Sequence, residues 1–162
     1  MKCYFLRHGP AGDPSQWKGR DFDRPLTGDG RERMECEAKT IEELGLDLDR
    51  IVSSPLVRAR QTAEIVADRL GLRDKLIEDE RLAGGFNSER LSEILRAHAG
   101  ADALMLVGHE PNMSATIGRL TGANLEFKKG ALACVEIGDI SLSRGTLLAL
   151  VPPKVLARAG KR

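Results

Sequence analysis

The sequence predicts a three-layer α/β/α domain, in which helices cover both faces of a mostly parallel sheet that ends in an antiparallel edge. The first observation is three short apolar runs, at residues 3–6, 51–53 and 103–107, each typical of a buried strand. The second is that stretches with helical spacing of apolar residues alternate with these runs. The third is a pair of later apolar runs, 131–137 and 146–151, around a loop at 138–145, which indicates an antiparallel pair. Strands alternating with helices are typical of this layered class.

Length and composition restrict the function. A chain of 162 residues is expected to form one domain, residues 1–162, with a substantial core. Its formal charge of +1 is spread evenly, so we expect no nucleic-acid partner and no membrane-surface role. No apolar run approaches the ~20 residues of a membrane helix, and the first apolar run is too short for a signal peptide. Three widely spaced cysteines, Cys3, Cys36 and Cys134, indicate reduced thiols and a cytoplasmic location.

The first strand is followed by a surface loop and then by a helix. Glycine, proline and charged residues predict a loop over residues 10–23, which Trp17, the only tryptophan, is expected to pin in place. Thr27 has the side chain of an N-cap residue for a helix that runs to Leu44. Gly45 suits the C-terminal cap of the same helix.

The second strand leads directly into a second helix. Ser54 followed by Pro55 predicts an N-cap with proline in the first helical position. This helix carries an apolar stripe and ends at Gly71, and residues 75–78 suit a short strand. The third strand is followed by a glycine turn and by Pro111, which is expected to open another helix.

Two further segments complete the predicted elements. Asn87 or Ser88 is expected to cap a helix whose apolar face ends in a histidine, through Leu91, Ile94, Leu95 and His98. Two prolines at 152–153 end the last strand, and residues 154–162 suit a short helix or a frayed tail.

Chemically distinctive side chains follow the ends of three predicted strands. Arg7 and His8 come directly after the first strand, Arg58 lies in the first turn of the helix after the second, and His109 follows the third. Ligands bind at the carboxyl edge of open α/β sheets. The N-termini of the helices that begin there favour anions. The sequence therefore predicts an anion site built from these four residues.

The motifs around the four residues resemble a known family. LRHG, SSPLVRARQTA and VGHEPN, in this order, resemble the three signatures of the histidine phosphatase (phosphoglycerate-mutase-like) superfamily. The resemblance runs from residue 1 to about residue 137 and so covers most of the chain. It implies the phosphoglycerate-mutase-like fold and a phosphatase that works through a phosphohistidine intermediate.

The residue types suit that chemistry. Arg7 and Arg58 offer planar forks of donors that stay charged, and His109 adds a donor, so these three are expected to bind the phosphate. His8 is expected to be the nucleophile, with a backbone carbonyl holding the N–H of its other ring nitrogen. Two neighbouring guanidiniums should lower the pKa of His8, which keeps its imidazole neutral. These four groups need no metal or other cofactor.

Other candidate residues have competing interpretations. Glu80, in the stretch ERLAG, resembles the glutamate that donates a proton to the leaving oxygen in mutase-like members, yet it also belongs to an acidic run that suits a solvated loop. Residues 128–129 are two lysines that could attract a phosphate, although a solvated pair is the preferred interpretation. A zinc site from His8, His98 and His109 is rejected, because close ligand spacing and a carboxylate partner are lacking.

The spacing of the motifs indicates the branch of the family. Pro10-Ala11-Gly12 after the first motif is closer to the RHGxA pattern of SixA-type phosphohistidine phosphatases than to that of the mutases. Only 28 residues separate Glu80 from His109, which leaves no room for a lid over the site. We therefore expect a phosphohistidine-bearing protein as substrate, and a monomer or weak homo-oligomer. The alternatives are a phosphatase of a small phosphomonoester and a non-catalytic module that binds phosphorylated ligands.

Overall fold

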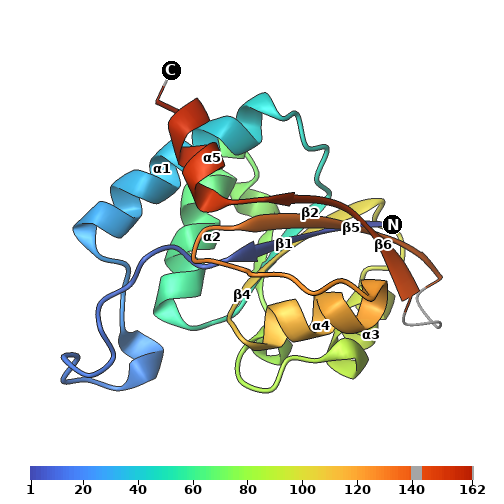
Figure 1. Ribbon diagram of the computed structural model, residues 1–162, viewed down its shortest axis with the longest axis horizontal. Helices are drawn as coiled ribbons and strands as arrows, with labels where there is room; N and C mark the ends of the chain where they lie inside the picture. Colours follow the sequence, from blue (N-terminus) through green and yellow to red (C-terminus); the bar gives the residue numbers. More distant parts are fainter. Residues whose placement is uncertain (140–143, 162) are drawn as a thin grey trace.

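A six-stranded sheet forms the centre of the protein in a computed structural model, which describes residues 1–139 and 144–161 (Figure 1). The strands lie side by side in the order β3-β2-β4-β1-β5-β6. Their bounds are β1 (Lys2–Arg7), β2 (Arg50–Ser53), β3 (Leu76–Glu78), β4 (Ala103–Gly108), β5 (Leu132–Asp139) and β6 (Arg144–Val151). The expected loop at 138–145 lies partly outside the described residues.

The sheet is parallel over four strands and antiparallel at one edge. Strands β3, β2, β4 and β1 run in the same direction, whereas β5 is antiparallel to β1 and β6 is antiparallel to β5. In the register, Phe5 of β1 lies between Leu106 of β4 and Ala133 of β5. The predicted mostly parallel sheet with an antiparallel C-terminal edge is thus confirmed.

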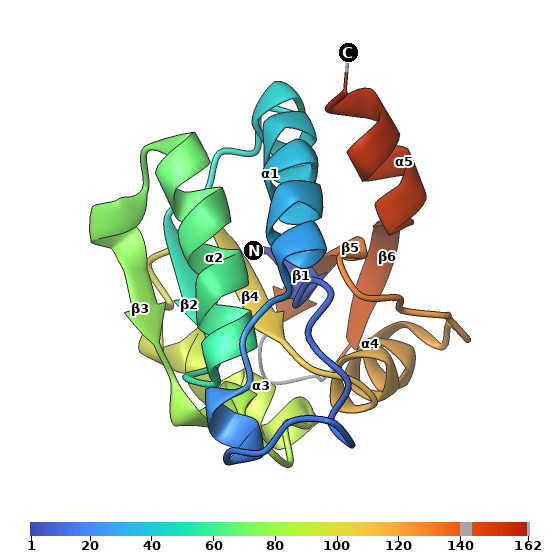
Figure 2. The same ribbon diagram turned by 90° about the vertical axis from the view of Figure 1, so that its left-hand side faces the viewer.

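Helices cover both faces of this sheet (Figures 1 and 2). One layer contains α1 (Gly28–Glu43), α2 (Val57–Leu70) and α5 (Pro153–Ala159), and the other contains α3 (Ser88–Ala97) and α4 (Asn112–Thr121). Each layer encloses its own apolar cluster against the sheet. Strand β1 contributes to both clusters, because alternate side chains of a strand point to opposite faces. Cys3 and Phe5 pack on the α3/α4 side, and Tyr4 and Leu6 pack on the α1/α2/α5 side.

Most of the predicted helix boundaries agree with the structure. The Thr27 side chain accepts a hydrogen bond from the Gly30 N–H at 2.9 Å, and α1 ends one residue before Leu44. Asn87 caps α3 in the same way, through the Arg90 N–H at 3.0 Å. Gly71 closes α2 with a φ of 67°, a left-handed conformation that glycine adopts without a steric penalty.

One predicted helix start was wrong. Helix α2 begins at Val57 with Leu56 at its N-cap, so Ser54 and Pro55 precede the helix. The Ser54 hydroxyl is instead bonded to His109. Pro111 opens α4 as predicted, from the N-cap position directly before Asn112 and without a capping side chain.

The segment between β1 and α1 is a surface loop, as expected. Trp17 donates from Nε1 to the Arg20 carbonyl at 2.9 Å, which pins this loop. A short 3-10 helix, η1 (Asp21–Asp23), contacts α2 (Figure 2). The C-terminal residues form α5, in agreement with the predicted short helix. None of the helices in the described ranges is long and apolar enough to cross a membrane.

Candidate active site

His8 lies just beyond the end of β1 and is only 5% exposed. Its backbone N–H donates to the Gly108 carbonyl of the neighbouring strand at 3.1 Å. Its ring Nδ1 lies 2.7 Å from the Gly9 carbonyl oxygen. A carbonyl oxygen can only accept, so Nδ1 carries the proton and Nε2 of the neutral ring keeps its lone pair. This is the backbone contact that the sequence led us to expect for a nucleophilic histidine.

The turn after His8 is held closely against α1 and α2. The Gly9 N–H donates to the Thr62 hydroxyl at 3.0 Å, and that hydroxyl donates to the Arg58 carbonyl at 2.8 Å. A Cβ at position 9 would overlap the Met34 side chain, so only glycine fits there. These contacts join the end of β1 to the first turns of α2, which carry Arg58.

Arg7, the last residue of β1, is fixed by the segment that precedes β5. Its Nη1 donates to the Phe127 carbonyl at 2.9 Å. The Gly130 N–H is shared between the carbonyls of Arg7 and His8, at 3.1 and 3.2 Å. The guanidinium of Arg7 is therefore oriented by a backbone carbonyl, and the charge of Glu110 partly offsets the lowering of its pKa by burial.

His109 follows β4 and faces His8, with the ring centroids 5.2 Å apart. Its Nε2 lies 2.7 Å from the hydroxyl of Ser54, which is fully buried at the end of β2. The same hydroxyl accepts from the Leu56 N–H at 3.3 Å, which leaves its proton free to donate to Nε2. This arrangement is compatible with a His109 ring that carries its proton on Nδ1.

Three nitrogen atoms of this cluster are buried and have no hydrogen-bond partner among the described residues: Arg7 Nε, Arg58 Nε and His109 Nδ1. Buried donors are nearly always paired, because an unpaired one costs about 1–3 kcal/mol. Each belongs to a different strand–helix connection, yet all surround His8. Three orphaned polar atoms around one histidine fit the predicted phosphate site.

The cluster lowers the pKa values of both histidines. Burial lowers the pKa of His8 to about 3, and the positive charges of Arg58 and Arg7 act in the same direction. Burial and the charge of Arg58 lower the pKa of His109 to about 4. Both rings are therefore neutral at pH 7, as a nucleophile at Nε2 of His8 requires.

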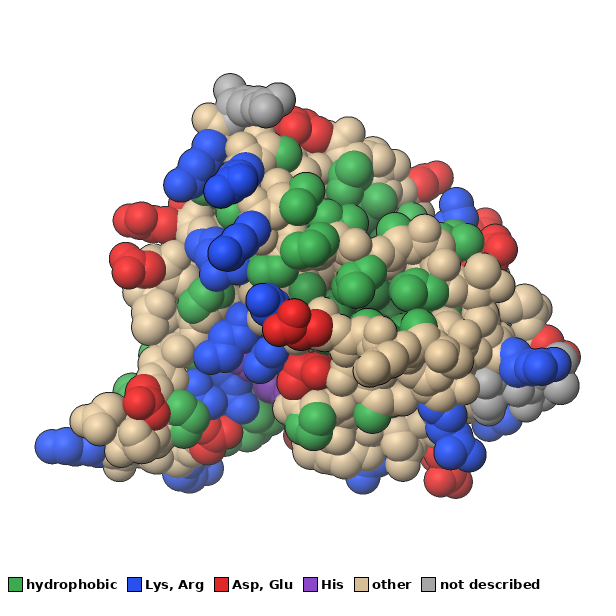
Figure 3. All heavy atoms as spheres, in the orientation of Figure 1, with side chains coloured by type: hydrophobic (Ala, Val, Ile, Leu, Met, Phe, Trp, Pro, Cys, Tyr) green, Lys and Arg blue, Asp and Glu red, His purple; other side chains and the backbone are tan. Residues whose placement is uncertain are grey.

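Further cations lie beside the four predicted residues, and Figure 3 shows Lys and Arg side chains gathered around a histidine on this face. Arg24 is 6% exposed and donates to the Gly12 carbonyl at 2.6 Å, and its charge also lowers the pKa of His109. Lys129 is half-buried, and desolvation together with the charges of Arg7, Arg24 and Arg58 lowers its pKa. Sequence reasoning missed Arg24 and treated both lysines as solvated, which was wrong for Lys129. Lys128 is exposed and pairs with Glu126 at 3.3 Å.

Two other sequence candidates differ in their positions. Glu80 opens the 3-10 turn η3 (Glu80–Leu82), which contacts β4, and the Leu82 carbonyl of this turn lies close to Gly108, the residue before His109. Its side chain is exposed, and within the described ranges it makes no hydrogen bond or ion pair. His98 ends α3 near Arg50, the first residue of β2, and so lies at the amino edge of the sheet. The three histidines are therefore not assembled into a zinc site.

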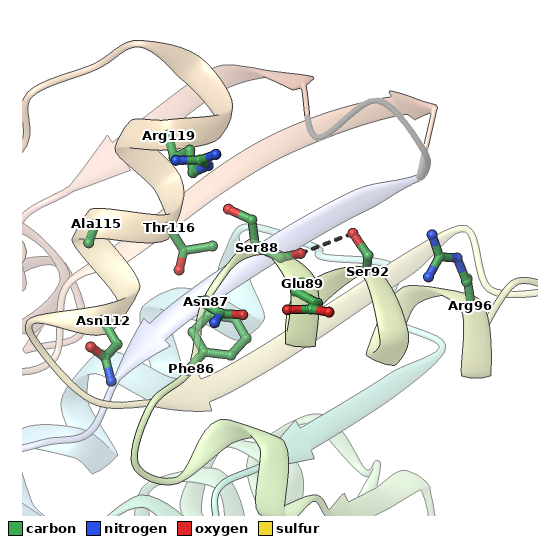
Figure 4. A pocket seen from close by; sticks show the side chains of 10 residues that line it. All are labelled: Phe86, Asn87, Ser88, Glu89, Ser92, Arg96, Asn112, Ala115, Thr116 and Arg119. Carbon is green, nitrogen blue, oxygen red and sulfur yellow. Dashed lines mark hydrogen bonds between the residues drawn. The ribbon is translucent and has the colours of Figure 1, made fainter.

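The surface beside the cluster is open and hollowed. A hollow of about 500 Å³ is lined by Arg7 and Glu110 and by residues 124–128. A second hollow, of about 740 Å³, lies between α3 and α4 and is lined by none of the four predicted residues (Figure 4). The first hollow therefore offers space for the part of a substrate next to its phosphoryl group.

The geometry agrees with a comparison to protein families. Residues 3–84 match the model of the histidine phosphatase superfamily (branch 1), which is half of the chain and includes Arg7, His8 and Arg58. The chain belongs to the histidine phosphatase superfamily. Its activity is accordingly that of a phosphatase.

Individual proteins are similar to this chain over most of its length. An uncharacterized protein of Picosynechococcus sp. is 36% identical over 96% of this chain and 99% of its own length. The phosphohistidine phosphatase SixA of Escherichia coli is 25% identical over 86% of this chain and 87% of its own. A structure of the protein histidine phosphatase SixA with tungstate superposes with a TM-score of 0.83 at 26% identity, covering 95% of this chain and 98% of that one.

Proposed function

We propose that this histidine phosphatase removes the phosphoryl group from phosphohistidine on a protein. The observation that carries the proposal is the short connection between Glu80 and His109. It consists of a 3-10 turn at 80–82, helix α3 and strand β4, joined by five-residue links at 83–87 and 98–102. No segment in it is long enough to fold over the cluster. An open site admits a protein surface that carries the phosphorylated side chain, and it encloses a small metabolite poorly.

The arrangement supports a two-step transfer through His8. In the first step Nε2 attacks phosphorus and the bond from phosphorus to the leaving nitrogen breaks; the substrate imidazole, whose other ring nitrogen has taken a proton from solvent beforehand, departs as the neutral ring. In the second step water attacks phosphorus and gives one proton to solvent, and His8 leaves as the neutral ring that keeps its proton on Nδ1. The orphaned donors of Arg7, Arg58 and His109 stabilise charge on the three equatorial oxygens in both steps.

The exposed position of Glu80 favours this substrate over an ester. An alkoxide leaving group is strongly basic and depends on a general acid for ~10²–10⁴-fold in rate. A leaving imidazole has a conjugate-acid pKa near ~6.5 and needs little help. The side chain of Glu80 is exposed and has no partner in the described residues, so the help that it gives to an ester leaving group is weak and would be lost in Glu80→Gln. Such a site is better suited to breaking a phosphorus–nitrogen bond.

The test compares a phosphohistidine peptide with an alkyl phosphate. The wild type should prefer the peptide, and Glu80→Gln should slow ester cleavage far more than peptide cleavage. Glu78→Gln is the matched control, because Glu78 is an exposed neighbour in the same acidic run. Arg58→Ala should damage both reactions, since it contacts the group common to both substrates. Equal rates on both substrates, with both strongly reduced by Glu80→Gln, would favour the small-phosphomonoester alternative.

The covalent step has its own test. Rapid quenching at alkaline pH should preserve phosphate on His8, since phosphoramidates are acid-labile, and peptide mapping should locate it. Label on Cys3, Cys36 or Cys134, or full activity in His8→Ala, would contradict the mechanism and would point to another nucleophile. Because protein donors surround the phosphate, activity should also survive exhaustive chelation.

A further inference from the structure

A carboxylate, that of Asp21, lies beside the phosphate-binding Arg58. Its position is unexpected, because a negative charge in an anion site repels the anion. Asp21, the first residue of η1, accepts from Arg58 Nη2 through its side chain at 3.0 Å and from Arg58 Nη1 through its backbone carbonyl at 2.9 Å. Its other carboxylate oxygen accepts from Arg24 Nε at 2.9 Å. Asp21 therefore bridges two buried guanidiniums.

The contacts take up one edge of the Arg58 guanidinium and leave another open. Both terminal nitrogens of Arg58 donate to Asp21, whereas its Nε is buried and has no partner in the described part of the chain. A guanidinium is planar, so fixing the two terminal nitrogens also fixes the direction of the Nε–H. Asp21 thus leaves free the edge of Arg58 that carries the orphaned donor.

The bridge is anchored at its other end. Arg24 donates to the Gly12 carbonyl at 2.6 Å and is 6% exposed, so its side chain has little freedom. The chain of contacts runs from the Gly12 carbonyl through Arg24 and Asp21 to Arg58. The Asp21 side chain is 58% exposed, but both arginines are buried, which makes this geometry more rigid than that of an ion pair with both partners exposed.

We propose that Asp21 is a positioning residue that holds the Nε edge of Arg58 toward the transferring phosphoryl group. The proposal rests on the phosphatase activity of the site and is independent of the phosphohistidine substrate. Asp21 itself does not contact the substrate. Its contribution is to keep a flexible side chain in the one orientation in which the Nε–H reaches an equatorial oxygen of the transition state.

The test compares wild type, Asp21→Asn and Asp23→Asn with p-nitrophenyl phosphate as substrate, and with vanadate and inorganic phosphate as inhibitors. Asp23 is the matched control, because it lies in the same 3-10 helix and pairs with the exposed Arg20 at 2.8 Å. Vanadate takes up the five-coordinate geometry of the transition state, and phosphate does not. Removing the negative charge of Asp21 strengthens the binding of both anions alike. The ratio of their inhibition constants therefore reports only on the orientation of Arg58.

In Asp21→Asn we expect kcat to fall about tenfold and the ratio of the vanadate to the phosphate inhibition constant to rise about tenfold, as for one misaligned charge-assisted hydrogen bond. Asp23→Asn should match the wild type in both. Inhibition constants do not depend on the fraction of folded enzyme, so a loss of stability alone would leave the ratio unchanged. An unchanged ratio in Asp21→Asn, or the same change in Asp23→Asn, would overturn the proposal.

Discussion

The neutral histidines of the site should make folding stability depend on pH between 7 and 5. Burial lowers the pKa of His8 to about 3 and that of His109 to about 4, from an ordinary value of 6.5. At pH 5 the unfolded chain protonates both rings and the native chain protonates neither. Unfolding then takes up protons, so the free energy of unfolding falls as the pH decreases below 6.5.

The size of the effect follows from the pKa shifts. Between pH 6.5 and pH 5, protonation stabilises the unfolded state relative to the native state by about 1.36 kcal/mol per pH unit for each ring. The free energy of unfolding therefore falls by about 2 kcal/mol for each histidine and about 4 kcal/mol for both. Below pH 4 the contribution of His109 stops growing, because the native ring then also binds a proton. The loss is comparable to a large fraction of the stability of a typical domain.

The assay is urea unfolding at pH 7 and pH 5 of wild type and of the double variant His8→Asn/His109→Gln. Asparagine places an amide N–H where Nδ1 of His8 donates, and glutamine places an amide group where Nε2 of His109 meets Ser54. The double variant should lose about 4 kcal/mol less than the wild type between the two pH values. His98→Gln, at the other edge of the sheet, should behave as the wild type does. A double variant with the wild-type pH dependence would refute the assignment of two neutral rings.

Other contacts give further predictions. Ser54→Ala removes the partner of His109 Nε2 and should lower kcat about five- to tenfold, the equivalent of one hydrogen bond, with KM nearly unchanged; an unchanged kcat would mean that the ring is oriented by other contacts. Lys129→Met should weaken inhibition by phosphate several-fold at low salt and less at high salt, whereas Lys128→Met should not; equal effects would place both lysines in bulk solvent. Gly130→Ala should lower the free energy of unfolding by about 1–3 kcal/mol in urea titrations, because Gly130 has a φ of 84° and an added Cβ would lie 2.5 Å from a buried carboxylate oxygen; wild-type stability would show that the turn relaxes freely.

The four central residues of the site were predictable because their signals are local. Each follows a short apolar run and lies beside a glycine or a helix start, which locates it at a strand end. Parallel strands bring such ends to one edge, so Arg7, His8, Arg58 and His109 meet without any further information. Glu80 also follows a short strand, but β3 is the edge strand of the sheet, so the same reasoning does not fix the distance of Glu80 from His8.

The remaining residues of the site depend on how the chain runs between elements. Asp21 and Arg24 lie in or after a loop without periodicity, and their contacts with Arg58 and Gly12 follow from its path over α2. Ser54 was expected to cap a helix, but its hydroxyl bonds to His109, which is 55 residues away in the sequence. Lys129 is drawn toward the cluster because the Gly130 N–H attaches its turn to the end of β1. Contacts of this kind between distant segments leave no pattern in a single sequence.

The acceptor that sets the tautomer of His8 is the carbonyl of the very next residue. A histidine whose tautomer is set by a distant aspartate can lose that tautomer when the aspartate moves or is substituted. Here no side-chain substitution can delete the acceptor, because it belongs to the main chain. Strand β1 and the turn after it therefore contain both the reactive nitrogen and the acceptor that sets its tautomer. The lengths and charges of the surrounding loops can therefore change to suit new substrates, while Nε2 of His8 keeps its lone pair.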